Sequence, residues 1–404
     1  MFPKAFLTLL LALPTFSNAV TLYASHYDGN VYALSLKGKG DDVSLELTQA
    51  LQTCGKSPSW LTAEPEQGLL WCSDESSPGT LTSLQVGKSG MLKELARINT
   101  PDGGTSSIIY SDNKGQKYLA VAHYSCSGDG SISTWAIPFA DKQDVQYHQI
   151  LKFTLDNHGK VPQDQPRPHQ VLLDPTGSFL VSPDLGADQV RVFLMDKGTG
   201  KLDACSPIPY AKGSGPRFGT FTGRKGSAPA QSSLKEKNGH EERIRLHTVE
   251  ELGNRLCSFD VLYVGNGCPT FKELGCFIPY PGNELPTNMA TLSEIQTNGP
   301  SLHVSVRKDG KFNGNDSLVT LTLGSEGVTM QENLFSSGGT VPRAFAINKD
   351  GDYIAVANQD TSNIVIIKRE PHTGKLVKEV ASLQVGLVPE PGQWMGLSSI
   401  VWYE

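Results

Sequence analysis

A set of polar residues stands at comparable points of the sequence, beside short apolar runs that are typical of β-strands. His169, Arg217 and Arg343 each follow a proline and precede such a run, whereas Glu251 and Arg307 each follow or end one. Guanidinium groups can stabilise a developing oxyanion or bind a carboxylate through two hydrogen bonds. A histidine or a glutamate can act as a general base on water. These residue types suit the attack of water on a carbonyl group, although each alone could equally be a surface arginine, a core histidine or a solvated glutamate.

The sequence contains no motif that would specify a reaction by itself. It lacks the Gly-x-Ser-x-Gly nucleophile elbow, the His-Glu-x-x-His zinc motif, a phosphate-binding loop and a calcium-binding loop. None of its seven cysteines forms a Cys-x-x-Cys pair, so zinc ribbons and thioredoxin-like redox chemistry have no support. We therefore expect a site without a cofactor, and a divalent metal ion is the alternative left open.

Composition limits both the fold and the partners. Of the 404 residues, 41 are glycine and 25 are proline, and only 19% are charged, which favours an all-β protein rich in turns. The formal charge of −6 argues against a nucleic-acid partner, because an acidic surface repels phosphates. No run approaches the roughly 18 apolar residues of a membrane-spanning helix. We expect a monomer with neither a nucleic-acid nor a membrane partner.

The chain repeats a glycine turn followed by two β-rich runs. The turns at Gly177 and Gly351 open two segments that align without a gap, and both segments reach Thr-Gly-Lys-Leu, at residues 199–202 and 373–376. Weaker copies occur around Gly68, Gly115, residues 244–261 and Gly299. One small sheet cannot bury both of its faces, so strand-only repeats of roughly 50 to 60 residues are typical of propeller blades.

Six copies and the N-terminal hairpin of residues 22–34 predict an all-β, seven-bladed β-propeller with four-stranded antiparallel blades. It is expected to be one domain over residues 20–404, closed by a C-terminal strand near residues 398–403. Six or eight blades remain the alternatives. Residues 223–246 are polar, mixed in charge and rich in Gly, Ser, Lys and Glu, which predicts a surface insertion.

The first residues indicate export. Lys4 precedes the apolar run of residues 5–13, and Ser17-Asn18-Ala19 supplies the small residues of a cleavage site. Residues 1–19 are therefore predicted to be a signal peptide, which makes the mature protein secreted and extracellular. Asn315 begins a glycosylation sequon, which suits a secreted glycoprotein.

An oxidising compartment allows disulfides to form among the seven cysteines. At most three can form, which leaves one thiol over. The cysteines that are close in the sequence suggest Cys54 with Cys72, and a pair within residues 257–276. The sequence does not fix the full pairing.

Several stretches resemble the family of seven-bladed lactonases, which includes bacterial 6-phosphogluconolactonase and fungal carboxy-cis,cis-muconate cyclase. The matching stretches are residues 168–177, 183–193, 213–217, 251–254, 356–360 and 389–396. The resemblance points to a secreted, fungal aldonolactonase-like member. It implies catalytic roles for His169, Arg217, Glu251 and Arg307. We further expect substrate-binding roles for Arg343, His123 and Arg167.

The chain also departs from the family pattern. Arg167 stands where the family often has a histidine, and Phe218 stands where a histidine often follows Gly-Pro-Arg. Glu250 is a rival to Glu251 for the position that faces the site. These differences bear on the substrate rather than on the fold.

Three functions stay open at this point. The resemblance implies a secreted lactonase that hydrolyses sugar lactones to aldonic acids, with a general base on water and arginines on the oxyanion. The alternatives are a cycloisomerase that forms a lactone from a carboxymuconate-like diacid, and a non-catalytic propeller that binds carbohydrate or protein. A signal peptide favours the first, because muconates and sugar phosphates are intracellular. We expect a small-molecule lactone as the partner, and a His169 that titrates near neutral pH.

Overall fold

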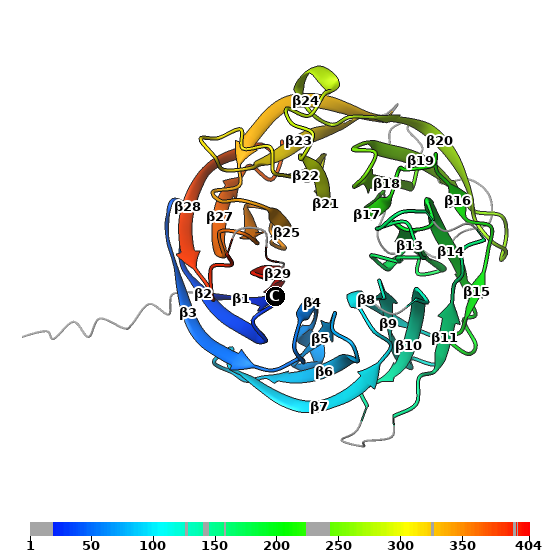
Figure 1. Ribbon diagram of the computed structural model, residues 1–404. Coiled ribbons are helices and arrows are strands. Elements are labelled where there is room, and N and C mark those ends of the chain that lie inside the picture. The colour runs from blue at the N-terminus through cyan, green and yellow to red at the C-terminus, as the bar shows by residue number, and fades with distance from the viewer. Residues whose placement is uncertain are drawn as a thin grey trace, which may run out of the picture.

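Strands form where apolar and small polar residues alternate, and turns that contain glycine separate them. The computed structural model describes residues 19–125, 128–139, 145–156, 159–223, 243–324, 327–390, 393 and 395–404. These residues form seven antiparallel sheets arranged in a ring around one axis (Figure 1). The predicted all-β, seven-bladed propeller is confirmed.

Each blade is numbered here from the N-terminus, with its strands given from the axis outward. Blade 1 holds β29 (Leu397–Tyr403), β1 (Val20–His26), β2 (Asn30–Lys39) and β3 (Asp42–Gln52). Blade 2 holds β4 (Pro58–Glu64), β5 (Leu69–Asp74), β6 (Gly79–Val86) and β7 (Leu92–Thr100), with the 3-10 helix η1 (Pro65–Gln67) after β4. Blade 3 holds β8 (Gly104–Ser111), β9 (Lys117–His123), β10 (Ser131–Ile137) and β11 (Gln149–Lys152).

The remaining four blades follow the same order around the ring. Blade 4 holds β12 (Leu172–Leu173), β13 (Phe179–Asp184) and β14 (Gln189–Met195), and its outer edge is divided between β15 (Leu202–Ala204) and β16 (Ile208–Pro209). Blade 5 holds β17 (Pro216–Thr222), β18 (Arg245–Glu250), β19 (Leu256–Leu262) and β20 (Thr270–Phe277), followed by the 3-10 helix η2 (Pro281–Asn283). Blade 6 holds β21 (Thr291–Asn298), β22 (Ser301–Arg307), β23 (Ser317–Gly324) and β24 (Gly327–Ser336). Blade 7 holds β25 (Pro342–Ile347), β26 (Tyr353–Asn358), β27 (Asn363–Arg369) and β28 (Leu376–Gln384).

The repeated glycine lies in the turn between the innermost and second strands of a blade. Gly177 and Gly351 adopt φ angles of +68° and +74°, a left-handed conformation that glycine adopts without steric cost. In the same turns, Asp174 and Asn348 each accept a hydrogen bond of 2.9 Å from the backbone N–H five residues later. The sequence repeat therefore marks the same hydrogen-bonded turn in blades 4 and 7.

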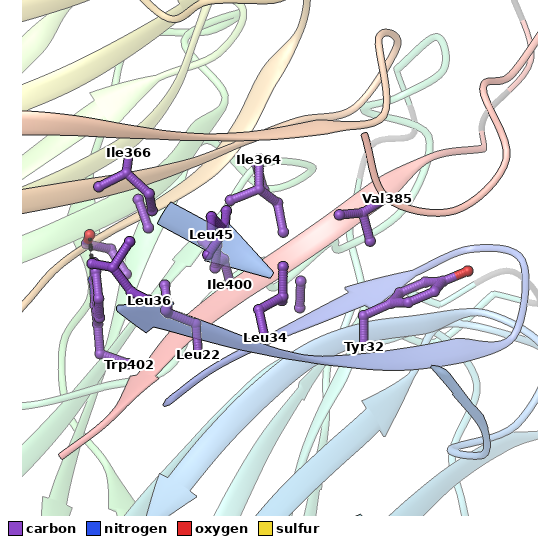
Figure 2. Packing of buried hydrophobic residues seen from close by; sticks show 14 of the residues in the cluster. Leu22, Tyr32, Leu34, Leu36, Leu45, Ile364, Ile366, Val385, Ile400 and Trp402 are labelled. Atoms are coloured by element: carbon purple, nitrogen blue, oxygen red, sulfur yellow. Dashed lines mark hydrogen bonds between the residues drawn. The ribbon is translucent and has the colours of Figure 1, made fainter. Parts of the chain in front are cut away.

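Strands from both ends of the described chain complete blade 1. β29 pairs with β1, which confirms the predicted closure. Figure 2 shows Leu22 and Leu34 of blade 1 packed against Ile364 and Ile366 of β27, and all four side chains are fully buried. Full burial of such a side chain is worth about 1.5–3 kcal/mol. Contacts between blades are therefore a main source of the stability of the ring.

Three disulfides join the described cysteines, in agreement with the upper limit expected from the sequence. They are Cys54–Cys72, Cys205–Cys268 and Cys257–Cys276. Both local pairings suggested by the sequence are confirmed. The seventh cysteine, Cys126, lies outside the described residues.

The predicted insertion of residues 223–246 is too long at its C-terminal end. Residues 224–242 lie outside the described residues, but Ile244 and Leu246 belong to a buried cluster, and β18 begins at Arg245. Leu246 alternates with polar neighbours along β18 and faces the core. The prediction extended too far because the segment before Leu246 is polar in composition. The predicted signal peptide, except for Ala19, also lies outside the described residues. No helix within the described ranges has the length and hydrophobicity needed to cross a membrane.

Candidate active site

Irregular pairing at the start of the innermost strands directs side chains toward the axis. In β17 the register with β18 shifts between Pro216 and Phe218, so Arg217 is the extra residue of a β-bulge. The same shift after Pro342 makes Arg343 the extra residue of β25. Bulges re-aim side chains and are common beside active sites. Proline suits the first position because it cannot donate a hydrogen bond to the ladder. The Pro-Arg pairs of the sequence thus mark bulges.

The ends of the second strands lie beside these bulges, because neighbouring strands in a blade are antiparallel. Pro216 pairs with Glu250, so Glu251 leaves β18 next to Arg217. Arg307 ends β22 in blade 6. Blade geometry therefore brings an acid and two cations from blades 5 and 6 to the same end of the ring.

These residues line one cavity. Its volume is about 330 Å³. Its lining consists of Tyr27, Ser57, Glu75, Tyr124, His169, Arg217, Glu251, Arg307 and Arg343. The four residues predicted to be catalytic are therefore together, and Arg343 is with them.

Glu251 is held between two guanidinium groups. Its Oε2 lies 2.7 Å from Nε of Arg217, and its Oε1 lies 2.9 Å from Nη2 of Arg307. Both arginines are anchored on β21: Nη1 of Arg217 donates to the carbonyl oxygen of Ser293 at 2.8 Å, and Nε of Arg307 donates to Oγ1 of Thr291 at 3.2 Å. Because the innermost strand of blade 6 fixes both cations, their positions relative to Glu251 are set before any ligand enters.

The electrostatics keep Glu251 ionised. Burial by itself would raise the pKa of the Glu251 carboxyl, but Arg307 and Arg217 outweigh it, and the pKa lies below its ordinary value. Burial and the neighbouring Arg307 lower the pKa of Arg217, and Glu251 opposes this change. The trio carries two positive charges and one negative charge, so it has an unbalanced positive charge that can stabilise an oxyanion.

His169 is a neutral residue in this cavity. Burial and then the charges of Arg217, Arg343 and Arg307 hold its pKa well below the ordinary value. Its Nδ1 makes no hydrogen bond within the described part of the chain. The expectation that His169 titrates near neutral pH is therefore wrong, because a positive charge on its ring would be buried beside three guanidinium groups.

The cavity also contains a second ion pair. Nη2 of Arg343 lies 3.5 Å from Oε2 of Glu75, and the Tyr27 hydroxyl donates a hydrogen bond to the same carboxylate oxygen. The Arg343 guanidinium also lies 5.4 Å from the centre of the Tyr27 ring. Arg343 therefore lines the cavity as predicted, but paired with its own carboxylate.

Two residues expected to bind substrate lie outside the lining of this cavity. His123 is fully buried, and its Nε2 is 2.7 Å from Oγ of Ser133. Arg167 forms an ion pair of 2.8 Å with Asp164, and its guanidinium carbon is 4.6 Å from the centre of the Tyr124 ring. Arg167 thus packs against a residue of the cavity wall, and neither side chain is part of the lining that a substrate would contact.

The choice between the two adjacent glutamates is settled by their partners. Glu250 is fully buried, and both of its oxygens accept hydrogen bonds of 2.9 Å from Arg255. Glu251 is the one that lines the cavity. Glu250 is the last residue of β18 and Glu251 begins the turn that follows it, which separates their roles.

One group of possible metal ligands lies close to the site. It comprises Glu250, Cys257 and Cys276. The two cysteines form a disulfide, so their sulfur atoms are not the thiolates that a metal ion would need. This group therefore offers no metal centre.

Sequence reasoning missed four residues of the lining. They are Tyr27, Ser57, Glu75 and Tyr124. Three of them stand directly after the second strand of a blade, behind β1, β5 and β9, as Glu251 stands behind β18. The repeat itself was thus the signal that could have found them.

Comparison with known proteins agrees with the seven-bladed fold. Residues 19–391 match the family model described as lactonase, 7-bladed β-propeller. The chain belongs to this family. This seven-bladed lactonase is 27% identical over 372 residues to a protein named probable 6-phosphogluconolactonase from Arthroderma benhamiae, a match that covers 91% of this chain and 84% of the relative. The prediction of an enzyme of the lactonase class is confirmed.

Two further comparisons extend over most of the lactonase. A 6-phosphogluconolactonase from Formosa agariphila is 26% identical over 297 residues, covering 70% of this chain and 73% of the relative. The solved structure of a periplasmic gluconolactonase from Pseudomonas aeruginosa has a TM-score of 0.73 at 24% identity, covering 96% of this chain and 99% of that one. The structural likeness shows that the two proteins share the propeller fold.

Proposed function

We propose that this lactonase hydrolyses the lactones of aldonic acids, with Glu251 as the general base. The observation that carries the proposal is the position of Glu251, with one oxygen at Arg217 and the other at Arg307, in a cavity of about 330 Å³. Ligand sites typically measure about 300–1,000 Å³. The cavity therefore suits a single small ring.

The reaction begins with water at the carbonyl carbon of the lactone. Glu251 takes a proton from the water as the new C–O bond forms, and the carbonyl oxygen becomes an oxyanion. Glu251 becomes neutral as the oxyanion forms, so the oxyanion replaces Glu251 as the negative charge beside Arg217 and Arg307. The net charge of the site therefore stays constant. The ring C–O bond breaks next, and Glu251 returns the proton to the leaving alkoxide, which yields the hydroxy acid.

Charge favours Glu251 over His169 as the general base. A proton taken up by His169 would create a fourth cation beside Arg217, Arg307 and Arg343, which the lowered pKa of the imidazole opposes. A proton taken up by Glu251 removes a negative charge at the moment the oxyanion needs the arginines. His169 is therefore assigned to positioning the water or the leaving oxygen as a neutral ring.

The proposed sugar-lactone substrate and the proposed location of the enzyme outside the cytoplasm rest on separate observations. Lys4, the apolar residues 5–13 and the small residues 17–19 form a pattern typical of exported proteins. Three disulfides support an oxidising compartment. Relatives named for gluconolactone derivatives support an aldonic acid as the product.

The alternative is a cycloisomerase that forms a lactone from a diacid. The presence of three arginines in one cavity favours it, because each can bind a carboxylate. Purified secreted protein should be assayed on glucono-1,5-lactone, δ-valerolactone and a carboxymuconate, with and without chelator, and with Arg307→Ala as the control. Lactone hydrolysis lost in Arg307→Ala supports the proposal. Turnover of the diacid alone would overturn it.

A further inference from the structure

The ion pairs of the cavity form two sets, called here its two halves, that differ in net charge. One half holds Arg217 and Arg307 with Glu251 alone to balance them, so it has an excess of one positive charge. The other half holds Arg343 and Glu75, whose charges cancel. Only the first half is therefore suited to an oxyanion, and the second half needs a different explanation.

The second half combines hydrogen-bond acceptors and donors at close range. Glu75 is a carboxylate that can accept several hydrogen bonds, while Arg343 offers donors from a planar group. The hydroxyls of Ser57 and Tyr124 belong to the same lining. Burial raises the pKa of Tyr124 to about 12, so its hydroxyl stays protonated and can donate a hydrogen bond.

These groups are fixed before any ligand enters. The backbone N–H of Glu75 donates to the carbonyl oxygen of Ser57 at 2.9 Å, which ties the two wall segments together. The Tyr27 hydroxyl donates to Glu75, and the Tyr27 ring lies under the Arg343 guanidinium. Burial tends to lower the pKa of Arg343, but Tyr27 and Glu75 raise it, so the cation persists.

From this arrangement we infer that Tyr27, Glu75, Tyr124 and Arg343 form a subsite for the hydroxyl groups of the lactone, which selects uncharged polyhydroxy lactones over phosphorylated or carboxylated ones. The inference rests on the proposed hydrolysis at Glu251. A vicinal diol both donates and accepts hydrogen bonds, so it can donate to Glu75 and accept from Arg343 at the same time. A phosphate or a second carboxylate would be placed against the Glu75 carboxylate and repelled.

The test compares Glu75→Gln with the wild type on three lactones. Glucono-1,5-lactone has hydroxyl groups and no charge. 6-Phosphoglucono-1,5-lactone has hydroxyl groups and a charged phosphate, and δ-valerolactone has neither hydroxyl groups nor a charge. We expect the wild type to prefer the uncharged sugar lactone to the phosphorylated one. Glu75→Gln should lower kcat/KM for glucono-1,5-lactone roughly tenfold, mainly through KM, because a lost hydrogen bond to a charged group is worth about that much. The preference over the phosphorylated lactone should shrink or reverse.

Tyr124→Phe provides a second variant that keeps the size and charge of the site. It should also lower kcat/KM for glucono-1,5-lactone more than for δ-valerolactone. The factor should be smaller than the one for Glu75→Gln. If both variants lower turnover of glucono-1,5-lactone and δ-valerolactone equally, or if the wild type prefers the phosphorylated lactone, the subsite is refuted while the lactonase assignment stands. If the wild type hydrolyses none of the three lactones, the proposed function itself fails.

Discussion

Arg307 Nη2 and Glu251 Oε1 lie 2.9 Å apart, although the two residues stand at the ends of second strands in different blades. Neither residue has a local reason to meet the other. The angle between blades 5 and 6 brings them together, and Arg217 at the bulge of β17 completes the arrangement. The proposed chemistry therefore depends on the packing of blade against blade rather than on any single loop.

Removal of one guanidinium should slow the reaction without unfolding the protein. Arg307→Ala is expected to lower kcat on glucono-1,5-lactone by roughly 10²–10³, because a lost oxyanion donor typically costs that much. Arg307→Lys should recover part of the loss, since it restores the charge but not the planar pair of donors. Initial rates should be measured beside thermal unfolding. A variant with wild-type kcat would remove Arg307 from the oxyanion site.

The pH dependence of turnover separates Glu251 from His169. The pKa of Glu251 is lowered, so the ionised base is present above that pKa and is lost as the pH falls through it. Because the pKa of His169 lies well below its ordinary value, kcat/KM on δ-valerolactone should stay level between about pH 5 and 8. Glu251→Gln should lower kcat by roughly 10²–10⁴ over the same range.

His169→Gln is the matched control for this pH measurement. It keeps a neutral hydrogen-bonding side chain, so it should be slower than the wild type but have a profile of the same shape. A pH-stat with the spontaneous rate subtracted gives both curves. An inflection near pH 6.5 that is present in the wild type and missing in His169→Gln would identify the histidine as the base instead.

The fold could be predicted because its signals are local. The turns around Gly177 and Gly351 repeat both the left-handed glycine and the side-chain cap, so they are visible in the sequence. Part of the site was predictable for the same reason, since Pro216-Arg217 and Pro342-Arg343 mark bulges.

The direction of individual side chains could not be predicted in the same way. His123 and Tyr124 are adjacent, yet the first is buried against Ser133 and the second lines the cavity. Strand residues alternate between faces, so a one-residue error in position selects the wrong side chain. The ion pair of Glu75 with Arg343 could not be predicted, because the two residues are distant in the chain and only closure of the ring brings them together.

Glu294 should make stability depend on pH. This residue of β21 is buried, its Oε1 accepts from Nε2 of Gln296 at 2.6 Å, and its Oε2 accepts from the backbone N–H of Phe345 at 3.2 Å. Burial outweighs these hydrogen bonds and raises its pKa to about 7 from an ordinary 4.5. The folded protein therefore holds this proton more tightly than the unfolded chain, so the free energy of unfolding should fall as the pH rises from about 4.5 to 7.

Glu294→Gln isolates this contribution, because the amide does not titrate. Urea unfolding at several pH values across that window should give a flatter curve for the variant than for the wild type. The same slope in both proteins would show that other carboxyls carry the dependence. Activity on δ-valerolactone, measured in parallel, reports whether the nearby Arg217 keeps its position.

The Cys54–Cys72 disulfide should contribute substantially to the stability of the ring at its closure. It links the segment after β3 of blade 1 to β5 of blade 2, and both cysteines are fully buried. A disulfide that closes a loop of this length stabilises a protein by about 3 kcal/mol in the chain-entropy model. The double variant Cys54→Ala/Cys72→Ala should therefore unfold at lower urea than the wild type. The matched control is Cys205→Ala/Cys268→Ala, which removes a disulfide in another part of the ring.

Because Ser57 lies just beyond Cys54 in the cavity wall, the Cys54→Ala/Cys72→Ala variant alone should also raise KM for glucono-1,5-lactone. Equal KM values in the two variants would show that the disulfide supports the fold but does not position the wall of the site.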